Sequence, residues 1–236
     1  MLGTPRASTH RLLVSLREAG MLEVVEGGRY RLSMRVFELG SRVPVLPQLM
    51  EVARRPLEIL TEAVGTPALL GVREGTEVLF IDRFAHRATP LAARMGTRGP
   101  LHATAMGKVL LAGAPVEVVE QVLAAPLRAY TPYTVVDPGQ LLAQLATIRE
   151  RGVAYVDQER RLGIFGMAVP IRGPVGQVIA GIDIPGPRAV VMGSQRKREL
   201  LLRQAAAEVE RAIRLRTSRR RTVHAGTNGA AEPRSG

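Results

Sequence analysis

The alternation of strand and helix patterns between residues 49 and 215 is the feature that most constrains the fold of this 236-residue chain. Short apolar or alternating runs predict strands, and apolar residues three or four positions apart predict helices. Two strands are expected around Gly75, and two more around the turn GPVG at 173–176. Strands interleaved with helices in one chain predict an α/β (α+β) domain with a sheet flanked by helices.

The helices of this region have recognisable boundaries and apolar faces. One helix is expected after Pro100, and another, LLAQLATIRERG, ends at Gly152. A further helix is VEVVEQVLAAP, and the last is long, basic and rich in alanine, SQRKRELLLRQAAAEVERAIRLR. The expected apolar positions are Ala105, Val109 and Ala112 in the first helix, and Leu200, Leu201, Ala205 and Val209 in the last.

The first twenty residues predict a helix with one strongly polar side. Thr4 is a suitable N-cap, Pro5 suits the first helical position, and Gly20 suits the C-terminal cap. A helix that enters the major groove of DNA needs polar groups near its N-terminus. The residues that would contact DNA are Arg6, Ser8, Thr9, His10 and Arg11, and the apolar face comprises Leu12, Leu13, Leu16 and Ala19.

A basic hairpin follows this helix directly. MLEVVEGGRYRLS reads as two alternating strands around Gly27 and Gly28, with Arg29 and Arg31 placed to reach phosphate or the minor groove. A polar-faced helix followed by a basic hairpin is the order of a winged helix-turn-helix. The alternative for the helix alone is an amphipathic surface helix with a solvated polar face.

The net charge of +12 and the pI near 11.3 favour a polyanionic partner, with nucleic acid first. However, Lys108 and Lys197 are the only lysines among 33 basic residues, and such an arginine bias also fits a GC-rich genome. Charge alone therefore does not decide the function.

Several function classes lack their sequence signals. The chain has no cysteine, and its four histidines are far apart, so we expect no metal and no cofactor. Phosphate-loop, dinucleotide-binding, nucleophile-elbow and zinc-protease motifs are missing, so we expect no enzyme; the remaining catalytic alternative is His102 paired with Asp82 or Asp157. No secretory signal and no long apolar run occur, which predicts a cytoplasmic protein without a membrane partner.

Five segments between Thr4 and Arg211 resemble the IclR-type bacterial transcriptional regulators. The segments are PRASTHRLLVSLREAGMLE, GRYRLSMRVFELG, PLHATAMGKVLLAG, YTPYTVVDPGQLLAQLATIRERGVAYVDQE and GMAVPIRGPVGQVIAGIDIPGP. The resemblance implies a winged helix-turn-helix followed by a GAF-like effector domain. It also implies operator DNA and a small organic ligand as partners, and homo-oligomers in which dimers formed through the DNA-binding domain and linker helix pair into tetramers.

Composition divides the chain into four parts, and the resemblance implies their roles. Residues 1–33 are expected to be a partial DNA-binding domain, and 34–48 a linker helix broken by Pro44 and Pro47. Residues 49–215 are expected to form the effector-binding and oligomerisation domain, and 216–236 a disordered basic tail.

The chain departs from the family pattern at its beginning. The family has two helices before the recognition helix, whereas only Met1, Leu2 and Gly3 precede it here. A start site assigned too late, a cloning boundary and a natural truncation are the three explanations, and we favour the first. The alternative function is a stand-alone small-molecule-binding domain that has lost autonomous DNA binding.

The resemblance also implies where an effector binds. The family pocket opens at a helix N-terminus, here Thr104, Ala105 and Met106, and is closed by strands that carry Asp157, Gly166 and Asp183. Gly166 stands where cysteine is common and should leave extra room, while Asp183 stands where serine is common and adds a charge. We expect an organic acid whose carboxylate meets the helix N-terminus and whose hydroxyl or amine reaches Asp183. The alternative is that Asp183 pairs with an arginine such as Arg94; the ligand, the operator and the sign of regulation do not follow from the sequence.

Overall fold

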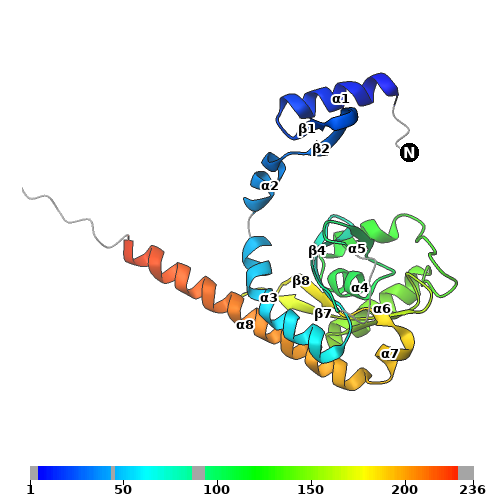
Figure 1. Cartoon of the computed structure of the whole chain (residues 1–236). Coiled ribbons are helices and arrows are strands. Elements are labelled where there is room, and N and C mark those ends of the chain that lie inside the picture. The colour runs from blue at the N-terminus through cyan, green and yellow to red at the C-terminus, as the bar shows by residue number, and fades with distance from the viewer. Residues whose placement is uncertain (1–4, 44–45, 87–93, 228–236) are drawn as a thin grey trace, which may run out of the picture. The chain divides into compact units, whose positions relative to one another are not determined.

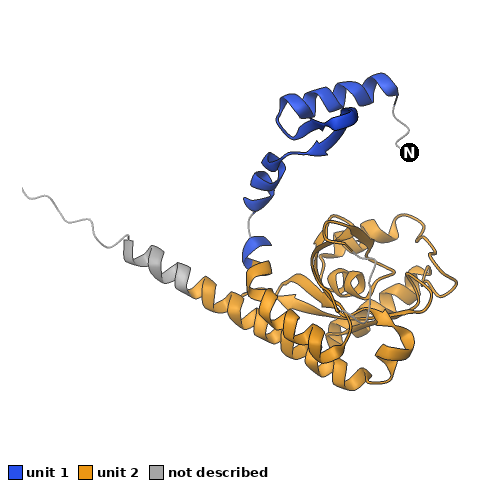
Figure 2. Ribbon diagram, in the orientation of Figure 1, with its two compact units in different colours: residues 1–48 blue, residues 49–236 orange. Residues whose placement is uncertain are grey.

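A computed structural model describes residues 5–43, 46–86 and 94–227, with side chains as far as residue 218. The chain divides into two compact units, residues 1–48 and residues 49–236 (Figure 2). The first unit contains α1 (Arg6–Glu18), β1 (Leu22–Val25), the short 3₁₀ turn η1 (Glu26–Gly28), β2 (Arg29–Leu32) and α2 (Met34–Ser41).

The helix and hairpin predicted at the start of the chain are confirmed. Gly20 follows α1 with φ +71°, and the N–H of Met21 donates to the Leu16 carbonyl at 2.8 Å, as in a glycine-terminated helix end. The strands β1 and β2 are antiparallel, and the turn between them uses positive φ at Gly27 and Gly28. Thr4, the predicted cap, lies outside the described residues. None of the side chains of α1 is fully buried: Leu13 and Leu16 of the expected apolar face are partly covered, whereas Leu12 and Ala19 are exposed.

The predicted break at Pro47 is wrong. Helix α3 (Leu46–Val64) begins at Leu46 and contains both Pro47 and Pro56. A proline in the first turn of a helix removes no intrahelical hydrogen bond, because the first N–H groups have no acceptor there. The buried face of α3 repeats every three or four residues and comprises Leu49, Ala53, Leu57, Leu60, Thr61 and Val64.

The second unit is built on an antiparallel sheet with the strand order β5-β4-β3-β8-β7-β6. The predicted strands around Gly75 and around the turn 173–176 are confirmed, as is the expected mixed architecture of a sheet flanked by helices. The strands are β3 (Ala68–Glu74), β4 (Glu77–Phe84), β5 (Arg98–Pro100), β6 (Ala154–Asp157), β7 (Ile164–Arg172), β8 (Val178–Asp183) and the short β9 (Gly186–Pro187), which pairs with β7. The helices after α3 are α4 (Ala105–Ala112), α5 (Val116–Leu123), α6 (Pro138–Arg151), α7 (Arg188–Met192) and α8 (Gln195–Thr227).

Helices cover both faces of this sheet (Figure 1). Helix α4 packs closely on one face, where a Cβ at Gly181 would lie 2.6 Å from the Met106 sulfur, so a larger residue there would require the Met106 side chain to shift. Helix α8 packs against β7 from the other face, and Arg216 of α8 forms two hydrogen bonds of 2.7 and 2.6 Å with Glu51 of α3. The close approach of Met106 to Gly181 thus holds the start of α4 against the sheet.

Two sequence predictions for α8 are wrong. Ala205 and Val209 are buried as expected, but Leu200 is 57% exposed and Leu201 is only partly buried, while Leu202 and Ala206 are buried in their place. The predicted tail is helical as far as Thr227, and residues 228–236 lie outside the described part. A lack of large apolar residues prevents burial but does not prevent a helix, since arginine and alanine have high helix propensity. Within the described residues, no helix is long and apolar enough to cross a membrane.

Candidate functional site

The N-terminus of α4 is held by its own capping residue. Thr104 Oγ1 accepts a hydrogen bond from the Gly107 N–H at 2.9 Å and donates one to the Pro100 carbonyl at 2.9 Å. A Cβ at Gly107 would lie 2.5 Å from that same carbonyl oxygen, so glycine is required where the chain turns into the helix. These contacts fix the direction in which the first backbone N–H groups of α4 point.

The backbone N–H groups of Thr104, Ala105 and Met106 make no hydrogen bond with any part of the chain that the structure describes. The first N–H groups of a helix have no acceptor inside the helix, and they favour an anion because the helix dipole is positive at this end. The predicted anion-binding end of the helix is therefore unoccupied by the chain's own acceptors.

Three of the predicted effector residues lie together at this helix end. A Cβ built on Gly166 would lie 3.2 Å from the Ala105 Cβ, 3.5 Å from Asp183 Oδ1 and 4.0 Å from the Ala105 nitrogen. Asp183 is therefore a neighbour of the first residue of α4. The expectation of extra room for a ligand at Gly166 is wrong, because Ala105 and the Asp183 carboxylate occupy that space.

Asp183 is a buried carboxyl group without a charged partner. The residue is 5% exposed, and its Oδ1 has no hydrogen-bond partner. Burial raises the pKa of Asp183 from 3.8 to about 7, although a hydrogen bond with the Met167 backbone acts in the opposite direction. Among the described residues no cation pairs with Asp183, so the alternative of an ion pair with Arg94 is wrong.

Asp157 and His102 are held away from this group by other partners. The Asp157 carboxylate accepts two hydrogen bonds from Arg188 Nε, at 2.9 and 2.8 Å. His102 Nε2 lies 3.0 Å from the Arg128 carbonyl oxygen, and its ring packs 5.9 Å from the Tyr130 ring. The suggested acid–base pair of His102 with Asp82 or Asp157 is therefore not formed.

A buried ion pair on α4 did not follow from any sequence pattern. Lys108 is 1% exposed, and its ammonium group donates to Glu159 Oε1 and to Gln144 Oε1, the latter at 2.7 Å. Glu159 Oε2 also accepts from the Val135 N–H at 3.2 Å. Burial lowers the pKa of Lys108, and Glu159 opposes that effect. A lysine within the apolar run AMGKVLLAG was the available signal, but its partner is 51 residues away.

In the first unit, the predicted DNA-binding side chains of α1 differ in availability. Arg6, His10 and Arg11 are exposed and line a shallow hollow, whereas Ser8 and Thr9 are half-covered. Thr9 Oγ1 lies 3.3 Å from the Pro5 carbonyl and donates to it. Three side chains therefore remain open to a partner.

The two arginines of the hairpin also differ. Arg31 Nε donates to Glu23 Oε1 at 2.8 Å from the directly opposite position of the other strand, and this hydrogen bond raises the pKa of Arg31. Arg29 is exposed beside the turn and forms no ion pair within the described part of the chain. Arg29 is thus the freer of the two for a phosphate contact.

Comparison with known proteins assigns the family. A family model described as "Bacterial transcriptional regulator IclR C-terminal" matches residues 46–211, which include the whole α4 site. The chain belongs to the IclR family of bacterial transcriptional regulators. Its second unit is the C-terminal domain of that family, as the sequence motifs predicted.

Relatives of known name support this assignment. The chain is 34% identical over 184 residues to the HTH-type transcriptional regulator BhcR of Paracoccus denitrificans, a match that covers 77% of this chain and 66% of BhcR. It is 32% identical over 191 residues to XynR of Escherichia coli, covering 78% and 74% of the two chains. Among solved structures, an IclR homologue from Microbacterium hydrocarbonoxydans in complex with 4-hydroxybenzoate has 34% identity and a TM-score of 0.80, covering 89% of this chain and 87% of that one. The chain thus spans about two thirds to three quarters of these named regulators.

Proposed function

We propose that this IclR-family chain binds operator DNA through its first unit and a small organic acid at the start of α4. The observation that carries the proposal is the meeting of unbonded helix N–H groups with the buried, unpaired Asp183 carboxyl group. A buried polar atom without a partner is costly, so such an atom beside an anion-binding helix end favours a ligand that bonds to both. We propose no catalytic activity and no cofactor.

The ligand would carry two kinds of group. A carboxylate suits the N–H groups of Ala105 and Met106, and a hydroxyl or amine donor suits Asp183 Oδ1. The Microbacterium relative holds 4-hydroxybenzoate, which has both a carboxylate and a hydroxyl group. We propose a small hydroxy or amino acid of this kind, with Thr104 placing the helix end and Gly166 allowing Ala105 and Asp183 to approach. Asp157, which is paired with Arg188, is not part of the proposed contact set.

DNA binding through α1 gives a direct test of this function. A DNA sequence selected from a random pool serves as the operator, and Arg6→Ala is expected to weaken its binding by roughly 1–3 kcal/mol, because an arginine that contacts base edges discriminates between sequences. Arg29→Ala is expected to weaken all sequences about equally, since a phosphate contact carries no sequence information. Gel shifts with operator and scrambled DNA measure both effects, and addition of 4-hydroxybenzoate is expected to change operator affinity.

Arg17→Ala provides a matched control on the same helix, because Arg17 lies in the last turn of α1, away from the predicted contact residues. Operator affinity should change little in this variant. Failure of the selection to enrich any sequence, or equal losses for Arg6→Ala and Arg17→Ala, would contradict the proposed DNA contact. An operator affinity that no small carboxylate changes would contradict the effector role alone.

Self-association is the second part of the proposal. The first unit exposes large apolar side chains along β2 and α2, including Leu32, Met34 and Phe37, of which Phe37 is 68% exposed. Contiguous apolar patches on monomeric proteins are usually small, so we propose that a second copy covers this surface and that the second units associate further. We expect a dimer or tetramer by light scattering at micromolar concentration, and Phe37→Ser should shift the distribution to smaller species. A wild-type chain that is strictly monomeric would refute this part.

A further inference from the structure

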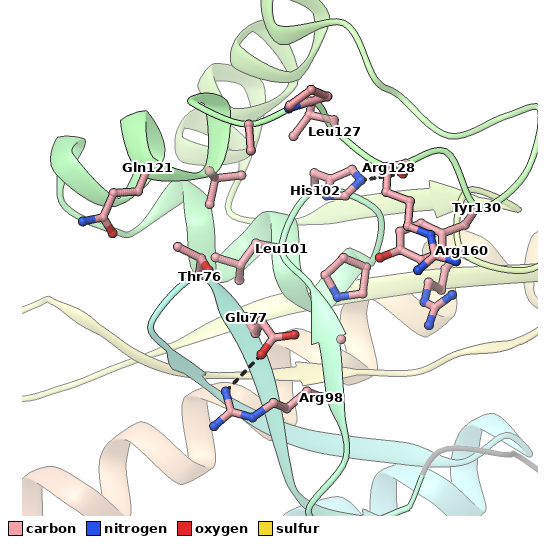
Figure 3. Close-up of a pocket in the computed structure, with 15 residues that line it drawn as sticks. Thr76, Glu77, Arg98, Leu101, His102, Gln121, Leu127, Arg128, Tyr130 and Arg160 are labelled. Carbon is pink, nitrogen blue, oxygen red and sulfur yellow. Dashed lines mark hydrogen bonds and ion pairs between the residues drawn. The ribbon is translucent and has the colours of Figure 1, made fainter. Parts of the chain in front are cut away.

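A cavity of about 360 Å³ lies between β5, the end of α5 and the segment that follows α5 (Figure 3). None of the residues expected to bind the effector lines it, so it is distinct from the site at the start of α4. Its volume is in the range of small-molecule sites. Its polar and aromatic lining includes Arg98, His102, Arg128, Tyr130 and Arg160.

Two of the three arginines in this cavity keep an unbalanced positive charge. Arg98 is paired with Glu77, with 3.2 Å between Arg98 Nη1 and Glu77 Oε2. In contrast, Arg128 and Arg160 form no ion pair in the part of the chain that the structure describes. Glu159, the neighbour of Arg160, is buried and engaged by Lys108, so it does not neutralise Arg160.

The two guanidinium groups converge on one aromatic ring. The Arg160 Cζ atom lies 4.1 Å from the centre of the Tyr130 ring, and the Arg128 Cζ atom lies 5.1 Å from it. A guanidinium that stacks on an aromatic ring uses one of its own flat faces for that contact. The N–H groups of the guanidinium lie in its plane and stay available for other acceptors. Figure 3 shows Arg128, Tyr130 and Arg160 gathered at one end of the cavity, beside His102.

Hydrogen bonds hold this end of the cavity in place. His102 Nε2 lies 3.0 Å from the Arg128 carbonyl oxygen, and the Tyr130 N–H donates to Thr134 Oγ1 at 2.9 Å. Thr134 Oγ1 in turn donates to the Glu159 carbonyl at 2.6 Å. The segment that carries Arg128 is thus tied to the segment that carries Arg160, and a site arranged before binding loses less entropy when a ligand enters.

We propose that this cavity is a second small-molecule site, which binds a small dianion between Arg128 and Arg160. Two guanidinium forks offer parallel N–H pairs that match the oxygen atoms of a phosphate group or of paired carboxylates. The ligand class is therefore a small phosphate-bearing or dicarboxylate metabolite. This site does not depend on the proposed effector site at α4.

Isothermal titration calorimetry with inorganic phosphate and with succinate, at constant ionic strength, tests the proposal. It also distinguishes a phosphate-bearing ligand from a dicarboxylate. The wild-type chain is expected to bind one of them, and Arg128→Gln with Arg160→Gln is expected to weaken that binding by about tenfold or more, because charge-assisted hydrogen bonds are lost. Arg160→Lys should restore part of the charge attraction but not the paired hydrogen bonds. Thermal melting of each variant confirms that it is folded.

The control pair is Arg161→Gln with Arg196→Gln, which removes the same charge from exposed positions that do not line the cavity. Its anion affinity should stay close to that of the wild type. Equal weakening in the control pair would show general attraction by a basic protein and would overturn the proposal. A wild-type chain that binds neither anion would overturn it as well.

Discussion

Lys108→Met is expected to lower the free energy of unfolding by about 3–5 kcal/mol, because removal of one partner leaves the other charge of a buried ion pair uncompensated. Lys108 and Glu159 are both almost fully buried, and Glu159 also holds the Val135 N–H. The variant therefore releases α4 from the segment around Val135 as well as removing a charge pair. Chemical denaturation followed by circular dichroism measures the change.

Arg55→Met is the matched control, since Arg55 and Glu58 form an exposed pair with 3.9 Å between Nη1 and Oε2. Its effect should be within about 1 kcal/mol, as for most exposed ion pairs. The double variant Lys108→Met with Glu159→Met should recover part of the loss, because no unpaired charge then remains buried. A Lys108→Met chain as stable as the Arg55→Met chain would contradict the importance of the buried pair.

Asp183→Asn is expected to raise the free energy of unfolding at pH 8 by up to about 4 kcal/mol, the energy equivalent of a pKa shift of this size. Burial raises the pKa of Asp183 from 3.8 to about 7, so the folded chain keeps a proton that the unfolded chain loses in this interval. The stability that this proton provides is fully present below about pH 4 and is lost as the pH rises through 7. Denaturation at pH 5 and pH 8 should show a smaller difference in the variant than in the wild type.

Asp157→Asn supplies the control, because Asp157 is partly exposed and paired with Arg188. Because this carboxylate is neither fully buried nor without a partner, its replacement should not raise the free energy of unfolding at pH 8. Asp183→Asn should also change the order of affinities in a panel of small carboxylates, since a neutral amide replaces the carboxyl group beside Ala105. Lower stability of Asp183→Asn at pH 8 would show that a partner stabilises the ionised carboxylate, against the structure.

The local elements followed from local patterns. The hairpin around Gly27 and Gly28 and the ends of α1 and α6 at Gly20 and Gly152 were all predictable, because each depends on a few neighbouring residues and on positive φ. Which leucine of α8 faces the sheet did not follow from the sequence, since several adjacent leucines fit a helical period and only packing against β7 selects Leu202. The alternation of period 2 and period 3.6 thus determined the mixed architecture but not every buried position.

The candidate site shows the same division between local and distant information. The sequence by itself determined that α4 begins after Thr104 with free N–H groups at its first turn, because capping and helical hydrogen bonding there involve adjacent residues. Only the tertiary structure decided that Asp183 lies beside Ala105, that Asp157 pairs with Arg188 and that Lys108 meets Glu159. These contacts join residues 31 or more positions apart, and they depend on strand register and on how α4 crosses the sheet, which no local pattern encodes.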